Sequence, residues 1–80
     1  MRKIKRRIKV KGVNYEIWLG IVKKSVGKNH FLKLYYYPGD PADENNKPVA
    51  LKSAFKSEDE AIEFGKNFMI DLYENALARN

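Results

Sequence analysis

The sequence predicts an α+β fold, in which a four-stranded antiparallel sheet is covered on one face by a C-terminal helix. Two observations lead to this fold class. Apolar and polar residues alternate with a period of two in four segments between residues 2 and 55, and apolar residues recur every three or four positions after residue 58. Because 80 residues can close only one small core, we expect residues 1–80 to form one domain in the order β-β-β-β-α.

The first two strands are predicted at residues 2–10 and 13–22, with Lys11 and Gly12 as a two-residue hairpin turn between them. This register places the apolar residues of both strands on one face and the odd-numbered cations of the first strand on the other. A slip of one residue would bring lysines onto the apolar face, so the pattern supports the register.

Two contacts follow from this register on the polar face. Arg7 lies opposite Glu16, which predicts an ion pair, and Lys5 lies opposite Trp18, which predicts a cation–π contact. Both contacts would lie on the face of the sheet that the helix leaves open.

The next segments predict a loop at residues 24–29 and a third strand, rich in aromatic residues, at 30–37. Residues 38–48 contain all three prolines and no large apolar residue, so they predict an exposed, mobile loop. The alternation over residues 49–55 predicts a short fourth strand, with its odd-numbered residues facing the core.

A helix is predicted to begin after Ser57, because Ser57 and Glu60 have the spacing of a capping box and carboxylates favour the positive end of a helix. The apolar residues of this helix recur at helical spacing and form a stripe that can cover one face of the sheet. The stripe consists of Ala61, Phe64, Gly65, Phe68, Met69, Leu72, Ala76 and Leu77.

The charge is distributed unevenly along the chain. The net charge is +6 and the isoelectric point is about 9.6, but residues 1–37 carry a net +10 and residues 38–80 a net −4. A domain with one basic and one acidic side orients itself in the field of a polyanion. The charge therefore favours a polyanionic partner without identifying it.

The open face of the predicted sheet combines cations with aromatic rings. On nucleic acid, cations neutralise phosphates and rings stack on bases. Because Arg7 is the one arginine expected on this face, we predict mostly backbone contact, and single-stranded or structured nucleic acid slightly ahead of duplex DNA. The predicted nucleic-acid-binding residues are Lys3, Lys5, Arg7, Lys9, Trp18, Phe31, Lys33, Tyr35, Tyr37 and Lys52.

Two other interpretations of this face stay open. An aromatic patch can be an interface with another protein or with a second copy of the chain, and aromatic residues also stabilise strands by cross-strand pairing alone. An acid–base pair of Glu16 and His30 for RNA cleavage has no support from spacing, so we expect a protein that is not an enzyme.

The composition argues against several other kinds of site. The chain has no cysteine, one histidine, no Asp-x-Asp-x-Asn-Gly loop and no glycine-rich phosphate loop, so we expect no metal, cofactor or thiol chemistry. It also has no run of seven or more apolar residues, which predicts a cytoplasmic protein without a signal peptide or a membrane partner.

The segment from Phe55 to Ala61 has the form Phe-x-Ser-x-x-Glu-Ala. It resembles the strand-to-helix junction of AP2-type and phage-integrase arm-binding domains, in which a small sheet backed by one helix binds DNA through the sheet. The chain departs from that pattern by a fourth strand, a long acidic loop and the lack of a Tyr-Arg-Gly opening. The resemblance implies a DNA-facing set of Lys5, Arg7, Trp18 and Lys33.

The order of four strands and a helix is equally similar to the PUR and PC4 single-strand-binding families. In those families the helix commonly takes part in dimerisation. No residue motif of this chain decides between the two resemblances, and both imply nucleic acid as the partner.

Overall fold

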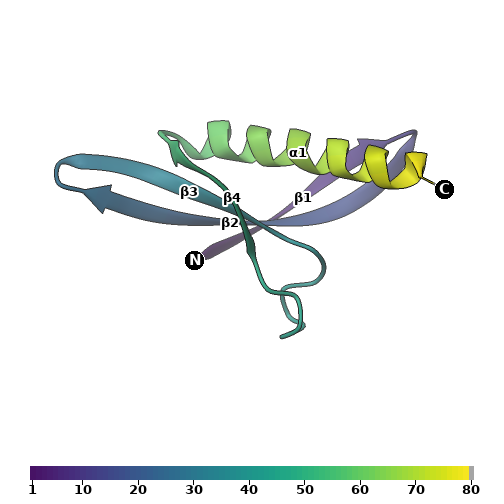
Figure 1. The fold of residues 1–80 in the computed structure, drawn as a ribbon, viewed down its shortest axis with the longest axis horizontal. Helices are drawn as coiled ribbons and strands as arrows, with labels where there is room; N and C mark the ends of the chain where they lie inside the picture. The colour runs from purple at the N-terminus through teal and green to yellow at the C-terminus, as the bar shows by residue number, and fades with distance from the viewer. Residues whose placement is uncertain (80) are drawn as a thin grey trace.

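A computed structural model describes residues 1–79. In this range the chain forms one antiparallel sheet of four strands in the order β1-β2-β3-β4, followed by one helix, so the predicted α+β fold is confirmed (Figure 1). The elements are β1 (Arg2–Val10), β2 (Val13–Val26), β3 (Asn29–Tyr37), β4 (Val49–Phe55) and α1 (Glu58–Ala78).

The hairpin of β1 and β2 has the register that the sequence predicts. Val10 pairs with Val13 across the turn, and the pairing continues without a shift to Arg2 and Ile21. Lys11 and Gly12 have φ angles of 50° and 81°, which is the left-handed backbone that a two-residue turn of this type requires.

The loop predicted at residues 24–29 is wrong. β2 continues to Val26 and β3 begins at Asn29, so a two-residue turn at Gly27 and Lys28 replaces the loop. These residues lack a period-two pattern because both faces of the hairpin are exposed to water here, so burial does not select apolar residues on either face.

The simple alternation predicted for β4 is also wrong. The pairing with β3 shifts at two places, around Ala54 and around Leu51, so that Ser53 lies opposite Lys33 and Lys52 lies opposite the core residue Leu34. Ala54 has a φ of 81°, as expected for a β-bulge that inserts one residue and reverses the faces of those that follow.

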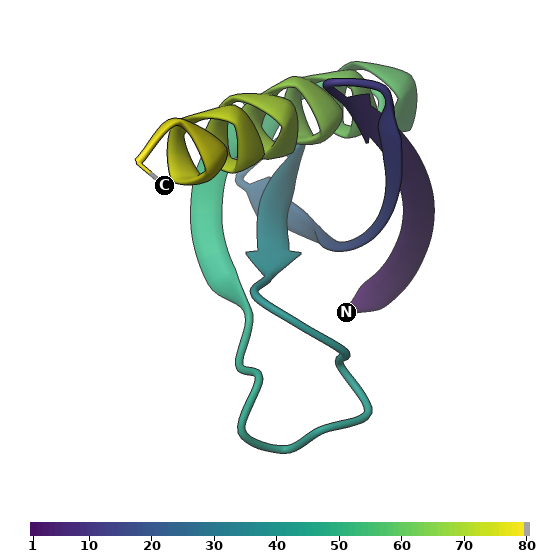
Figure 2. The ribbon, with the colours of Figure 1, turned by 90° about the vertical axis from the view of Figure 1, so that its right-hand side faces the viewer.

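The acidic segment 38–48 is exposed over most of its length, as predicted, and projects to the side of the sheet away from α1 (Figures 1 and 2). Two carboxylates shape it. Asp40 accepts a hydrogen bond from the Ala42 amide, and Asp43 accepts one from the Asn45 amide, both at 2.9 Å. Aspartate side chains in such turns accept hydrogen bonds from nearby backbone amides, which in a strand or helix would bond to backbone carbonyls.

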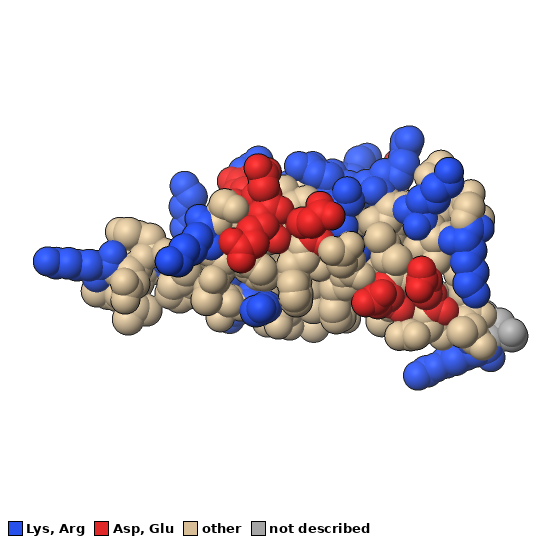
Figure 3. Space-filling model, turned by 90° about the horizontal axis from the view of Figure 1, so that it is seen from above, with Lys and Arg blue, Asp and Glu red and all other residues tan. Residues whose placement is uncertain are grey.

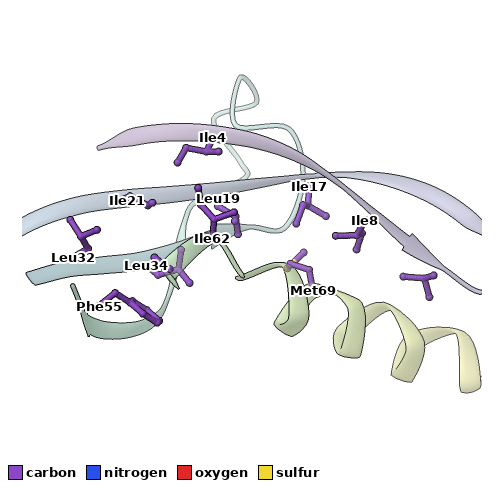
Figure 4. Packing of buried hydrophobic residues seen from close by; sticks show 12 residues of the cluster. Ile4, Ile8, Ile17, Leu19, Ile21, Leu32, Leu34, Phe55, Ile62 and Met69 are labelled. Atoms are coloured by element: carbon purple, nitrogen blue, oxygen red, sulfur yellow. The ribbon is translucent and has the colours of Figure 1, made fainter. Parts of the chain in front are cut away.

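The core lies between α1 and the face of the sheet on which the alternating apolar residues of the strands lie (Figure 4). Leu19 and Leu34 are fully buried at its centre. Gly65 of α1 faces both, and a Cβ atom at this position would lie 2.8 Å from Leu19 Cδ1. The buried cluster consists of Ile4, Ile8, Val10, Ile17, Leu19, Ile21, Leu32, Leu34, Phe55, Ala61, Ile62 and Met69.

The helix begins as predicted, but its apolar stripe is only partly buried. Ser57 Oγ accepts a hydrogen bond from the Glu60 amide at 3.2 Å, which confirms the N-cap. Phe64, Leu72 and Leu77 remain more than one third exposed. A straight helix of 21 residues is about 31 Å long, and a twisted sheet follows it closely over part of that length (Figure 2).

Gly65→Val should lower the free energy of unfolding by at least about 2 kcal/mol, because the added atoms overlap Leu19 in a packed core. Asn67→Val, on the exposed side of the same helix, is the matched control and should stay within about 0.5 kcal/mol of the parent. Urea unfolding followed by circular dichroism measures both. Equal stability of the two variants would contradict the close approach at Gly65.

Candidate nucleic-acid interface

The face of the sheet opposite α1, here called the open face, carries a row of cations on β1. Lys3, Lys5, Arg7 and Lys9 alternate with the buried Ile4, Ile8 and Val10, so their side chains leave the sheet on the side away from the core. Residues two apart on a strand are roughly 6.6 Å apart, so the four cations form an evenly spaced row. Such a row can contact several phosphates of one nucleic-acid strand.

Trp18 lies next to this row on β2. Its cross-strand partner Lys5 places Nζ 5.7 Å from the centroid of the indole ring, which confirms the predicted cation–π contact. The same ammonium group lies 3.4 Å from Glu16 Oε2. The predicted Arg7–Glu16 ion pair is therefore wrong: Glu16 pairs with its diagonal neighbour, within the reach of a long side chain.

Lys33 and Tyr35 continue the open face on β3. Lys33 Nζ lies 5.2 Å from the centroid of the Tyr35 ring, and both side chains are half-buried. Phe31, opposite Lys24 on the same face, is also half-buried. The structure thus places these three predicted residues on the face where the sequence puts them.

Tyr37 also lies on the open face, opposite Trp18. Contrary to the prediction, its ring is covered and not exposed to a ligand. It is 7% exposed, and its hydroxyl donates a hydrogen bond to Met1 Sδ at 3.5 Å. The Met1 side chain lies over Gly20, where the lack of a Cβ leaves room for it, and so covers the Tyr37 ring. Tyr37 therefore acts as packing on this face.

Lys52 was predicted on the open face and lies on the helix side. Its Nζ is 5.7 Å from the Phe55 ring and 5.1 Å from the ring of Phe64 on α1. The bulges of β4 cause the change, because they place Lys52 opposite the core residue Leu34. Lys52 therefore cannot act together with the cations of β1.

Apart from Glu16 and the segment 38–48, the acidic side chains lie on the helix side. Figure 3 shows this side of the molecule, where Asp and Glu gather over α1 and Lys and Arg lie along one long edge and at both ends. Arg2, on the helix side of β1, pairs with Glu58 at the start of α1. On the strands themselves Glu16 is the one carboxylate, so the cations of β1 outnumber the acidic groups of the sheet. Asp40 of the segment 38–48 lines a hollow next to Trp18 on this side.

Other chemistry finds little support. In the strand register Glu16 lies opposite Arg7, and His30 lies opposite Ser25, which is nine residues further along β2 than Glu16. About 30 Å therefore separates Glu16 from His30, which is too far for an acid–base pair. Among residues 1–79 no group of three or more His, Asp or Glu side chains is placed to hold a metal ion. Within that same range, no helix has the length and apolar character needed to cross a membrane.

Comparison with protein-family models gives no match, and neither the curated proteins nor the solved structures yield a similar chain. The resemblances to the AP2-type, phage-integrase, PUR and PC4 families therefore stay predictions.

The predicted set of binding residues omits one basic region. Lys23, Lys24 and Lys28 lie on the β2–β3 hairpin, where the sequence predicts a loop at residues 24–29. The signal is visible in the sequence, because residues 17–39 contain no Asp or Glu.

The Lys5–Glu16 pair is solvent-exposed, so it should contribute little to stability. We expect Glu16→Gln to change the free energy of unfolding by less than about 0.5 kcal/mol. Glu58→Gln is the comparison, because it removes an ion pair with Arg2 and a carboxylate at the positive end of α1. It should lower the free energy of unfolding by about 0.3–1 kcal/mol, more than Glu16→Gln does. Thermal unfolding at low salt measures the difference, and a larger loss for Glu16→Gln would contradict this assignment.

Proposed function

We propose that this protein is a non-catalytic, cytoplasmic nucleic-acid-binding protein that uses the open face of its sheet. The observation that carries the proposal is the row of Lys3, Lys5, Arg7 and Lys9 on one side of β1. In residues 1–79 only Lys5 of these four has an ion-pair partner. Unpaired cations at regular spacing add nothing to the core, and they suit a polyanion of regular charge spacing.

The aromatic rings have a secondary role in the proposal. Trp18 and Tyr35 each lie beneath a lysine ammonium group, at 5.7 and 5.2 Å. When a phosphate draws Lys5 or Lys33 away, the ring face below becomes available for a base. Stacking contributes about 1–3 kcal/mol per base, and with Tyr37 buried, neutralisation of the backbone supplies the larger part of the affinity.

A protein partner or a second copy on the same face is the alternative, and the surface favours it less. The exposed large apolar residues of the described chain are Met1, residues at strand ends and three residues of α1, and of these Met1 alone lies over Gly20 and Tyr37 on the open face. An interface between proteins needs a dehydrated apolar centre, whereas this face has lysines over its rings. Sedimentation at several concentrations, with and without Trp18→Ala, tests this alternative.

The direct test is a panel of labelled single-stranded DNA, duplex DNA and RNA at 50 and 200 mM salt. If six phosphates are contacted, affinity should fall about a thousandfold between the two concentrations, because counterions are released on binding. Fluorescence of Trp18 should be quenched wherever bases stack on it. Lack of binding at low salt, or binding that salt does not weaken, would refute the proposal.

Lys5→Gln combined with Arg7→Gln should weaken binding to all sequences alike and reduce the slope of log K against log salt by about two. Lys47→Gln combined with Lys66→Gln removes the same charge from outside the open face and serves as the control. An equal loss in both double variants would mean that net charge, and not this face, determines the affinity.

A further inference from the structure

The β2–β3 hairpin continues past the rest of the sheet as a free two-stranded arm, residues 23–31. β1 pairs with β2 as far as Ile21, and β4 pairs with β3 from Leu32 on, so neither edge strand covers these residues. Figure 1 shows this hairpin extending beyond the start of α1. Four residues of β2 at about 3.3 Å each make the arm roughly 13 Å long.

The arm carries cations on both of its faces. Lys23 lies opposite the core residue Leu32 and so projects to the helix side, Lys24 lies opposite Phe31 on the open face, and Lys28 is in the turn. All three lysines are exposed, and none has an ion-pair partner among the described residues. Neither β1 nor β4 pairs with the arm, and its lysines are not part of the core.

A hollow of about 390 Å³ lies at the base of the arm. It is lined by Lys23, Lys24, Ser25, His30, Phe31, Leu32 and Lys56, and Ser25 Oγ lies 2.8 Å from His30 Nδ1. No carboxylate lines the hollow. Lys23, Lys56 and the Ser25 hydroxyl beside one concave surface suit a phosphate group.

The tip of the arm carries residues of a different kind. Val26 is 67% exposed, and Lys28 and Asn29 beside it are exposed as well. In the major groove an amide side chain recognises adenine, a lysine recognises guanine, and an apolar group contacts the thymine methyl. The base of the arm thus has the groups that hold a backbone, and the tip has the groups that contact base edges.

From this arrangement we infer that the arm enters the major groove of duplex DNA, with its lysines on the phosphates of both groove walls. The inference rests on the proposed function and names its substrate class. The groove of B-DNA is about 12 Å wide and 8.5 Å deep and admits a two-stranded ribbon, and the arm is longer than the groove is deep. A-form RNA has a major groove too narrow for side chains, and a single strand has no groove walls.

Lys23→Gln combined with Lys24→Gln tests this inference against the parent and the Lys47→Gln/Lys66→Gln control. The arm variant should bind duplex DNA at least about tenfold more weakly, and the slope of log K against log salt should fall by about two. Its affinity for a single strand of the same sequence should change less than about threefold. Circular dichroism checks that each variant is folded. Equal losses on both substrates would overturn the inference and leave the proposed function standing.

Methylation of guanine N7 by dimethyl sulfate gives a second measurement, because N7 lies in the major groove. The parent protein should protect guanines at its bound site, and the arm variant should protect them less. Binding without N7 protection would overturn groove entry alone. A parent protein that binds no oligonucleotide would refute the proposed function itself, so the two failures are distinguishable.

Discussion

The structure depends on covering one face of the sheet and leaving the other open. α1 approaches the sheet closely at Gly65, where Leu19 and Leu34 fill the space that a side chain would need. This contact fixes which parity of every strand is buried, and a slip of one residue in β1 would bring Lys3, Lys5, Arg7 and Lys9 against the helix. The positions of the cations therefore follow from the packing of the core.

The open face is ordered by contacts that leave its charge available. Lys5 and Lys33 lie over aromatic rings, so their stems shield apolar surface while their ammonium groups stay in water. Only one carboxylate on the strands competes for them. The other acidic side chains lie on α1, on the opposite side of the sheet, and on the segment 38–48, which is outside the strands.

Much of the fold was predictable from the sequence, because burial on one face imposes a period of two on the strands and of 3.6 on the helix. The β1–β2 register, the N-cap and most of the core follow from these patterns. The prediction is wrong where burial does not act on the sequence: residues 24–29 form strand ends and a two-residue turn and not a loop, and the bulges of β4 place Lys52 on the helix side. The cover over Tyr37 by Met1 is a long-range contact that no local pattern encodes.

The most direct measurement of the central claim is a map of amide and indole NMR shifts during titration with a short DNA duplex at low salt. The account predicts shifts for residues 3–9, for the Trp18 indole, for Lys33 and for the arm, with α1 unchanged. Shifts concentrated on α1, or spread evenly over both faces of the sheet, would contradict it.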